Sequence, residues 1–378
     1  MKTPGSRRIR LGIIGTGLAA RRLHWPALSK MPERFEVAAF SNRTRSTAEE
    51  FAAFASLGMD GYNADYQKLL RRDDVEAVLV GVPIPQLLPI ARDCLQAGKH
   101  VICEKPPGGD LDEGREFVAL VRRHPDLVFL MAENFFYRDE LRLARSLIDD
   151  GRIGEPRLLL ERWVDQLVPT PGQFSITPWR YEPQYRGGPV LDAGVHSVAE
   201  IRLIGGDVVR VYMRTEWANP TMNAPSAFVA TLDFASGAIG NGVWAFLGNP
   251  VVDEGNDLRL YGSEGSLIVG RGRVRLVTAS GAVESWIFEN VDGGFYNEFL
   301  NFHEAIVLGA PVVGTVEQSY ANMLVVLRAL DSSDQHCSMD LDDLPGGPKA
   351  RAVPLWRPYG ADGLFDGLPV VVRRAEPT

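Results

Sequence analysis

The sequence predicts an α/β fold of two domains, the first built on a parallel sheet and the second on an antiparallel sheet. Over residues 8–132, short β-rich runs alternate with amphipathic helical stretches, a pattern typical of a parallel sheet flanked by helices. After Glu155 the strand-like runs are longer, and consecutive runs are joined without helices. The chain has 378 residues, 45% of them hydrophobic and 23% charged, which suits two ordinary globular domains.

The elements of the first domain follow this alternation. Strands are expected at Arg8–Ile14, Phe35–Phe40, Ala77–Val82, His100–Cys103 and Leu127–Ala132. Helices are expected over residues 18–30, 44–56, 86–97, 111–123 and 137–150. Gly98 and Gly151 stand where a glycine would end the helix before it.

The second domain shows strand patterns with one covered face. Strands are expected at Arg157–Asp165, Val208–Trp217, Ala227–Phe234 and Ala238–Leu247, the last two joined by a hairpin at 235–237. Phe228, Leu232 and Phe234 share one face of their strand. Helical patterns return over 296–309 and 316–332. We therefore expect domains at 1–133 and 134–332, followed by an extension at 333–378.

Composition argues against several kinds of partner. The net charge is −8, and no long basic cluster occurs, so nucleic acid is not expected as the main partner. The cysteines Cys94, Cys103 and Cys337 stand at unrelated spacings, which suggests neither a disulfide framework nor a zinc site. The start of the chain lacks the apolar segment of a secretory signal, and no apolar run approaches membrane-spanning length. We expect a cytoplasmic protein with no membrane partner and no metal.

A glycine-rich turn joins the first expected strand to the first expected helix. The run Gly15-Thr16-Gly17-Leu18-Ala19-Ala20 fits the pattern G-x-G-x-x-G/A. The first glycine permits the tight turn, the second lets a pyrophosphate approach the backbone, and a small third residue lets helix and strand pack closely. The alternative is a tight strand–helix turn without a ligand. Its place in the first βα unit favours a dinucleotide site.

The end of the second expected strand bears on the choice of cofactor. A site that prefers NAD usually has an acidic residue here, which binds both ribose hydroxyls. This chain has Ser41, Asn42 and Arg43 instead, and these groups suit a 2′-phosphate. The alternative is a helix cap formed by Ser41 or Asn42, with Arg43 in solvent. We expect NADP(H) to be preferred over NAD(H).

Lys105 follows the strand His100–Cys103, within the run Glu104-Lys105-Pro106-Pro107. Parallel sheets present their ligand contacts at the carboxyl ends of the strands, so Lys105 is expected beside the cofactor. A partly buried ammonium near a cationic nicotinamide has a lowered pKa, as an acid–base group requires. The alternative is a solvated surface lysine. We predict a cis Lys105–Pro106 bond, which would turn the chain sharply and aim the lysine.

Asp192 and His196 form the third candidate constellation. If their stretch is helical, residues four apart share a face. Asp192 can then orient a substrate hydroxyl or the imidazole, and His196 can exchange the proton. One alternative is a charge pair that caps a helix. A metal site that includes Glu200 is disfavoured, because helical spacing rotates Glu200 away from the other two.

Together these residues resemble the Gfo/Idh/MocA family, named for glucose–fructose oxidoreductase, inositol dehydrogenase and a rhizopine catabolism protein. The resemblance covers roughly residues 8–332. It is carried by the runs Ile13–Gly17, Ala97–Pro106, Trp179-Arg180 ahead of Gly187-Gly188, Asp192…His196, and Tyr261–Leu267. The run through Glu104-Lys105-Pro106 and the Asp192…His196 pair are its specific parts.

The resemblance implies an N-terminal Rossmann domain and a C-terminal α/β domain with an open, mostly antiparallel sheet. That sheet commonly builds dimers, so a homodimer or homotetramer is expected. The implied activity is NAD(P)-dependent interconversion of a hydroxyl and a ketone on a sugar, cyclitol or related polyol. Lys105 and His196 would handle protons and Asp192 would position the substrate. The residues expected to bind the cofactor are Gly15, Thr16, Gly17, Leu18, Ala19, Ser41, Asn42, Arg43, Val82, Pro83, Glu104, Lys105, Asn134, Trp179 and Arg180.

The sequence departs from the family at two places and leaves alternatives open. Leu87 stands where the family often has the histidine of Pro-Asn-x-x-His, and the family gives no guide to residues 333–378. Trp179 and Arg180 could instead be a core tryptophan and a surface arginine. Two other functions compete: a glycoside hydrolase or lyase that uses bound NAD(H) transiently, and a non-catalytic dinucleotide sensor. The intact set of Lys105, Asp192 and His196 argues against the sensor.

Overall fold

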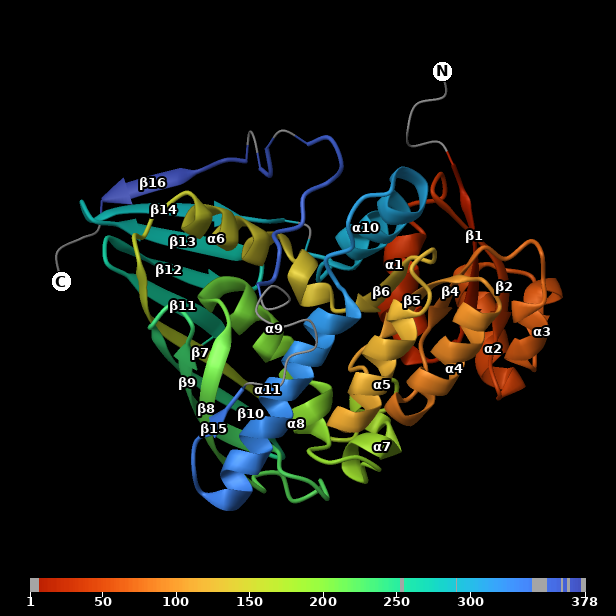
Figure 1. Cartoon of the computed structure of the whole chain (residues 1–378), viewed down its shortest axis with the longest axis horizontal. Helices are drawn as coiled ribbons and strands as arrows, with labels where there is room; N and C mark the ends of the chain where they lie inside the picture. The colour runs from red at the N-terminus through yellow and green to blue at the C-terminus, as the bar shows by residue number, and fades with distance from the viewer. Residues whose placement is uncertain are drawn as a thin grey trace. The chain divides into compact units, whose positions relative to one another are not determined.

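The chain divides into two compact units, shown together in Figure 1. The computed structural model describes residues 7–251, 255–289, 291–341, 352–361, 363–365 and 368–374. Unit 1 comprises Met1–Asn134 and Phe295–Tyr320, and unit 2 comprises Phe135–Gly294 and Ala321–Thr378. These units differ from the expected domains in two respects: residues 295–320 cluster with the first part of the chain, and the expected extension belongs to unit 2.

Unit 1 is built on a six-stranded parallel sheet in the order β3-β2-β1-β4-β5-β6, the strand order of doubly wound dinucleotide-binding folds. Its strands are β1 (Ile9–Ile14), β2 (Phe35–Ser41), β3 (Tyr62–Asn63), β4 (Ala77–Val80), β5 (His100–Glu104) and β6 (Phe129–Ala132). Every residue of β4 and β6 is buried, because helices cover both faces of such a sheet. The predicted Rossmann domain is confirmed.

The helices of unit 1 follow the predicted alternation with short additions. They are η1 (Ala20–His24), α1 (Trp25–Leu28), α2 (Arg45–Ala55), η2 (Met59–Gly61), α3 (Tyr66–Leu70), α4 (Ile84–Gln96), α5 (Leu111–Arg122) and α10 (Phe295–Leu308). The first helical stretch covers 18–28, and its segment η1 is a π-helix. Two further helices cross the division of the units, η3 (Asn134–Tyr137) and α11 (Val316–Gln335). Short elements such as β3 and α3 carry too few residues for a periodic signal.

Unit 2 contains a ten-stranded sheet in the order β15-β8-β9-β10-β7-β11-β12-β13-β14-β16. Strands β7 and β10 run parallel, and the other neighbours are antiparallel. The strands are β7 (Pro156–Gln166), β8 (Val208–Glu216), β9 (Ala227–Phe234), β10 (Ile239–Leu247), β11 (Asp257–Gly262), β12 (Gly265–Gly270), β13 (Arg273–Thr278), β14 (Ala282–Ile287), β15 (Met339–Asp340) and β16 (Val371–Arg374). This confirms the predicted mostly antiparallel sheet.

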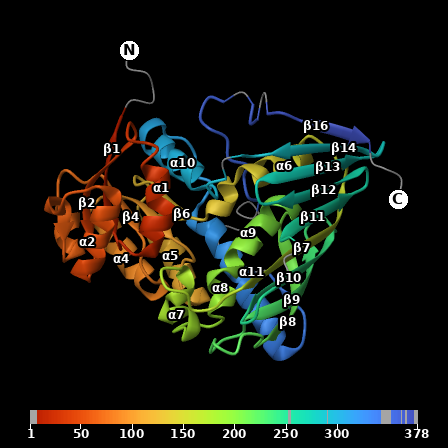
Figure 2. The same ribbon diagram turned by 180° about the vertical axis from the view of Figure 1, so that it is seen from behind.

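Helices cover one face of the ten-stranded sheet. The helices of unit 2 are α6 (Asp139–Asp149), η4 (Phe174–Ile176), α7 (Pro178–Tyr181), α8 (Pro189–Asp192) and α9 (Gly194–Gly205), together with most of α11. Figure 2 shows α6, α9 and α11 along the covered face, where α9 packs on β7 and α6 packs on β12 and β13. On the other face lie Leu160, Tyr212, Val229, Ile239 and Tyr261, which are 36–57% exposed. We call this second face the open face.

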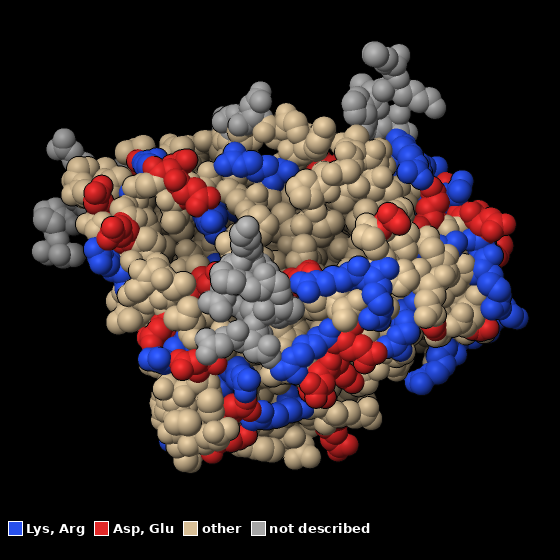
Figure 3. Space-filling model, viewed as in Figure 1, with Lys and Arg blue, Asp and Glu red and all other residues tan. Residues whose placement is uncertain are grey.

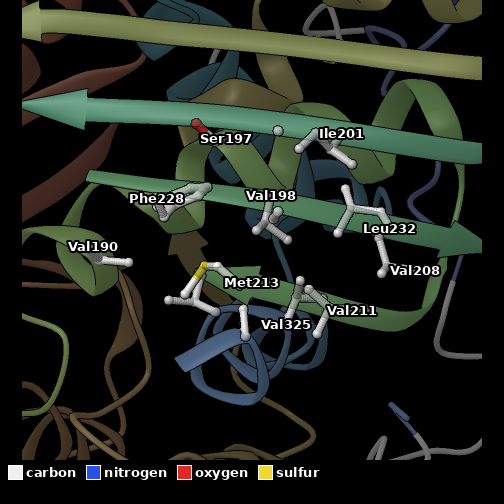
Figure 4. A pocket seen from close by; sticks show the side chains of 14 residues that line it. Val190, Ser197, Val198, Ile201, Val208, Val211, Met213, Phe228, Leu232 and Val325 are labelled. Carbon is white, nitrogen blue, oxygen red and sulfur yellow. The ribbon is translucent and has the colours of Figure 1, made fainter. Parts of the chain in front are cut away.

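A pocket lies inside unit 2 where α9 and α11 meet β8, β9 and β10 (Figure 4). Val198 and Ile201 line it from α9, Val325 from α11, and Met213 and Leu232 from the strands. Its lining is apolar apart from the Ser197 hydroxyl. This pocket belongs to the apolar layer between the helices and the sheet.

The C-terminal extension packs onto unit 2. Its strands β15 and β16 pair with β8 and β14 at the two ends of the sheet. The Trp356 ring lies 4.5 Å from the Arg142 guanidinium on α6 and meets the Tyr137 ring edge-on at 5.8 Å. Trp356 is 2% exposed, so the described part of the extension supplies core residues to this unit.

The surface charge and the helices of the described residues can be compared with what the composition predicts. On the face shown in Figure 3, basic and acidic side chains alternate in small groups. Within the described ranges, no helix is both long and apolar enough to cross a membrane.

Candidate active site

The glycine turn of unit 1 has the geometry of a dinucleotide site. Gly15 has φ +93°, and a Cβ on it would lie 2.2 Å from the Gly81 carbonyl oxygen, so only glycine fits. A Cβ on Gly17 would meet no atom within 4 Å, which leaves space above the turn. The Thr16 hydroxyl is buried without a hydrogen-bond partner among the described residues. An open backbone and an unsatisfied hydroxyl beside a helix start suit a pyrophosphate.

The predicted ribose segment lies beside this turn. The Asn42 amide is used within the protein: its Oδ1 accepts from the Thr16 N–H at 3.2 Å, and its Nδ2 donates to the Thr44 carbonyl at 2.9 Å. Ser41 is buried, whereas Arg43 is exposed. Helix α2 has Thr44 at its N-cap without a side-chain cap, so the alternative that Ser41 or Asn42 caps this helix is wrong.

Other cofactor residues predicted for unit 1 line the carboxyl side of its sheet. Leu18 and Ala19 are half-buried at the start of the first helical stretch. Val82 and Pro83 follow β4, with exposed Pro83 at the N-cap of α4, and buried Asn134 follows β6. Leu87, at the position of the missing histidine, is fully buried on α4 and therefore serves packing.

Lys105 stands at the end of β5, half-buried. The Lys105–Pro106 bond is cis, as predicted. The preceding Cys103 is fully buried, and burial raises the pKa of its thiol well above the usual value, which makes it a poor nucleophile. The lysine and the Glu104 carboxylate are therefore the polar groups that β5 presents at this end.

Sequence reasoning missed a partner of Glu104. The His24 Nε2 lies 2.7 Å from Glu104 Oε1, and the His24 side chain is 0% exposed. The two residues are 80 positions apart, and a lone histidine in a helical stretch gives no signal of such a contact.

In unit 2, Asp192 is held by an arginine. Its Oδ2 lies 3.1 Å from Arg180 Nη2. The Arg180 guanidinium also stacks 4.1 Å from the centre of the Trp179 ring and donates to the Phe174 carbonyl at 3.1 Å. Arg180 is 17% exposed and Trp179 is half-buried, so neither a surface arginine nor a core tryptophan describes them.

The stretch around Asp192 is divided into two helices. Asp192 ends α8 and His196 lies in the first turn of α9, so the condition that one helix runs through both residues is not met. Gly188 precedes α8 with φ +48°, and a Cβ there would lie 2.8 Å from Pro183. Only glycine fits this tight turn, which leads directly into α8. Glu200, the residue weighed for a metal, lies 3.9 Å from Arg138.

The His196 imidazole stacks on an aromatic ring that sequence reasoning did not identify. It lies 4.7 Å from the Phe135 ring at an angle of 18°. Phe135 also stacks on Trp163 at 5.8 Å, and the Arg138 guanidinium lies 4.6 Å from its ring centre. The stacking on Phe135 limits the orientations that the imidazole can adopt.

Two further titratable groups lie near this constellation. Burial raises the pKa of the Tyr185 phenol, and the charge of Asp192 raises it further. Burial, followed by the charge of Glu200, raises the pKa of Glu161 on β7 well above its usual value. Glu161 accepts a hydrogen bond from the Ser197 hydroxyl at 3.0 Å. No motif marks Tyr185 or Glu161, although Tyr185 precedes the Gly187-Gly188 pair.

Comparison with known proteins gives the class of protein as an oxidoreductase with an NAD-binding Rossmann fold. Residues 9–131 match the family described as "Oxidoreductase family, NAD-binding Rossmann fold", and residues 141–268 match the "GFO/IDH/MocA C-terminal domain". The chain therefore belongs to the Gfo/Idh/MocA family, as the sequence resemblance predicted.

The chain is similar to several individual oxidoreductases. A dTDP-3,4-didehydro-2,6-dideoxy-alpha-D-glucose 3-reductase of Streptomyces antibioticus is 31% identical over 54% of this chain and 59% of the reductase. An oxidoreductase from Thermotoga maritima is 27% identical, with a TM-score of 0.80 over 89% of this chain and 99% of that one. Levoglucosan dehydrogenase, solved with NADH and levoglucosan, has a TM-score of 0.79 over 89% of this chain and 100% of its own. It is 19% identical, so this likeness shows the fold alone.

Proposed function

We propose that this protein is an NAD(P)-dependent oxidoreductase that interconverts a hydroxyl and a ketone on a sugar, cyclitol or related polyol. The observation that carries the proposal is Lys105 at the carboxyl end of β5, in the same parallel sheet as a glycine turn that fits a dinucleotide. The sugar substrates named for the Streptomyces reductase and for levoglucosan dehydrogenase support the substrate class.

The proposed chemistry divides among three side chains. Lys105 and His196 hold and exchange the proton of the substrate hydroxyl, and Asp192 orients that hydroxyl. Arg180 fixes the Asp192 carboxylate, and the Phe135 ring fixes the plane of the His196 imidazole. The nicotinamide cofactor, when bound, supplies the hydride-transfer chemistry. Its contacts would come from the residues around Gly15, Thr16 and Gly17.

For the cofactor we propose NADP(H) over NAD(H). Exposed Arg43 follows the end of β2, and no acidic residue stands at Ser41 or Asn42. A guanidinium binds a phosphate strongly, and a carboxylate here would repel it. We also propose a cytoplasmic location.

The open face of unit 2 supports a homodimer or a larger homo-oligomer. Its apolar side chains lie on adjacent strands from β8 to β11, and a stable interface needs about 800 Å² from each partner. A charged Val229→Arg variant should dissociate the assembly in sedimentation experiments. Phe54→Arg on α2, also an exposed apolar position, is the control. A wild-type monomer at high concentration would refute this part of the proposal.

The function is tested with a panel of sugars and cyclitols. Purified protein is mixed with each compound and NADP+ or NAD+, and nicotinamide absorbance is followed. Turnover of at least one compound, lost in Lys105→Ala, is the expected result. Product formation from a glycoside without net cofactor change would instead favour the transient-cofactor hydrolase or lyase. Cofactor binding without any turnover would favour the sensor.

A further inference from the structure

His24 is a buried histidine at the junction of two cofactor-site segments. It ends the π-helical segment η1, which belongs to the helical stretch that follows the glycine turn. Its Nε2 lies 2.7 Å from Glu104 Oε1, at the end of β5. A carboxylate only accepts hydrogen bonds, so the ring nitrogen carries the proton and donates.

The surroundings of the His24 ring give this hydrogen bond a fixed direction. Phe295 and Phe299 on α10 meet the ring edge-on, each with its centroid 5.7 Å away. The other ring nitrogen, Nδ1, is buried without a hydrogen-bond partner among the described residues. A ring packed between phenylalanines has little freedom to turn, and Glu104 is its polar contact.

His24 can affect Lys105 through its contact with the Glu104 carboxylate. Glu104 is the last residue of β5, and Lys105 follows it directly through the backbone. The Glu104 side chain is 17% exposed, so contacts inside the unit, the one with His24 among them, set its position. A displacement of the strand end would move the backbone from which Lys105 projects.

We propose that His24 is a positioning residue for Lys105, acting through the hydrogen bond that anchors Glu104 at the end of β5. This inference rests on the proposed acid–base function of Lys105. The contact also joins the helix of the dinucleotide turn to the strand that carries the lysine. The His24 side chain is 0% exposed, so its role does not require contact with substrate or cofactor.

The test compares variants on both sides of the hydrogen bond. His24→Phe keeps an aromatic ring among the phenylalanines and removes the donor, whereas His24→Gln keeps an N–H donor. Glu104→Met removes the acceptor and tests the same contact if His24→Phe folds poorly. The matched control is His303→Phe, because His303 is also fully buried, with its Nε2 2.7 Å from the Arg7 carbonyl oxygen.

Two readouts separate positioning from a structural role. The first is the rate at which acetic anhydride labels Lys105, measured by peptide mass spectrometry relative to exposed Lys30 and Lys68. It needs no substrate. The second is kcat against KM for a compound found in the panel, with cofactor Kd measured separately. A misplacement near 1 Å can cost about 100-fold in rate, so kcat should fall by about 10–100-fold with little change in cofactor Kd.

The expected result is a changed Lys105 labelling rate and a lower kcat in His24→Phe and in Glu104→Met. The double variant should be no worse than either single one, and His24→Gln should recover most of the loss. His303→Phe should change neither readout. Additive effects, or an unchanged labelling rate in both single variants, would overturn the inference. Full activity in Lys105→Ala would instead refute the proposed function, whatever the labelling shows.

Discussion

The two sheets of this protein are built on opposite principles. The parallel sheet of unit 1 is covered on both faces, and every residue of β4 and β6 is buried. The sheet of unit 2 buries one side and leaves Val229 and Ile239 more than half exposed on the other. A sheet buried on both faces can offer ligands only its strand ends, whereas a half-covered sheet keeps a whole face for contact.

The candidate site residues of the two units also lie on different kinds of element. In unit 1 the candidate groups follow strands: Thr16 after β1, Ser41 at the end of β2 and Lys105 after β5. In unit 2 they lie on helices: Arg180 on α7, Asp192 on α8 and His196 on α9. We expect substitutions in the two units to impair different properties of the protein, such as turnover, cofactor affinity and stability.

The largest expected effect tests whether both units contribute to proton transfer. Lys105→Ala and His196→Ala should each lower kcat by about 100- to 10,000-fold, because each removes a proposed acid–base group. Cofactor Kd, measured by nicotinamide fluorescence, should stay nearly unchanged. Lys30→Ala, at an exposed lysine of unit 1, is the control. Near-normal turnover in either variant would remove that residue from the mechanism.

The next effect tests the reliance of unit 2 on its C-terminal extension. Trp356→Ala should lower the free energy of unfolding by about 3–5 kcal/mol, because it leaves a cavity beside Arg142 where the indole ring, which is 2% exposed, now packs. Urea denaturation measures this loss. Trp217→Ala replaces a tryptophan that is 56% exposed and should cost far less. Equal losses in the two variants would show that the extension is not part of the core.

A smaller effect concerns cofactor choice in unit 1. Arg43→Ala should weaken NADP binding by about 1.5–3 kcal/mol, as expected for the loss of a charged hydrogen bond, and leave NAD binding unchanged. Titration calorimetry with both cofactors measures the difference. Wild-type protein that binds NAD at least as tightly as NADP would contradict the proposed preference.

The smallest effect is a pH dependence located in unit 2. Burial raises the pKa of Glu161, so the folded protein keeps a proton that the unfolded chain releases above about pH 4.3. The free energy of unfolding should therefore fall as pH rises from there toward the raised pKa, by up to about 1.4 kcal/mol per pH unit. Glu161→Gln cannot titrate and should lose this slope. Urea denaturation at about pH 5 and pH 6, an interval over which the loss is at most about 1.4 kcal/mol, measures it, and parallel slopes for both proteins would contradict the assignment.

The elements predicted from the sequence were those with a strong repeating pattern. The alternation of strands and helices gave the main parallel strands, and the face of Ala227–Phe234 indicated a half-covered sheet. The small strands β3, β15 and β16 could not be predicted, because two to four residues carry no periodicity. The sequence patterns also did not predict that residues 295–320 pack with the first part of the chain, because this depends on contacts between residues distant in sequence.

The site shows a similar limit. Motifs marked Gly15, Lys105, Asp192 and His196, because turn geometry and acid–base chemistry restrict those residue types. The residues that the motifs did not mark are partners: Phe135 stacks on His196, and His24 contacts Glu104, the neighbour of Lys105. Such contacts depend on how distant segments pack, which local patterns do not report.

Unit 1 consists of two segments of the chain, and most of unit 2 lies between them in the sequence. This order has a consequence for synthesis on the ribosome. The Met131 N–H donates to the Gly314 carbonyl at 2.7 Å, and the His24 ring packs against Phe295 and Phe299. At about 5–20 residues per second, the segment that begins at Phe295 emerges roughly 10–30 s after Asn134. Throughout that interval the nascent parallel sheet lacks α10 and exposes the apolar surface that α10 later covers. The first domain to be translated is thus unable to finish folding until most of the second has left the exit tunnel, and a chaperone has that interval in which to act.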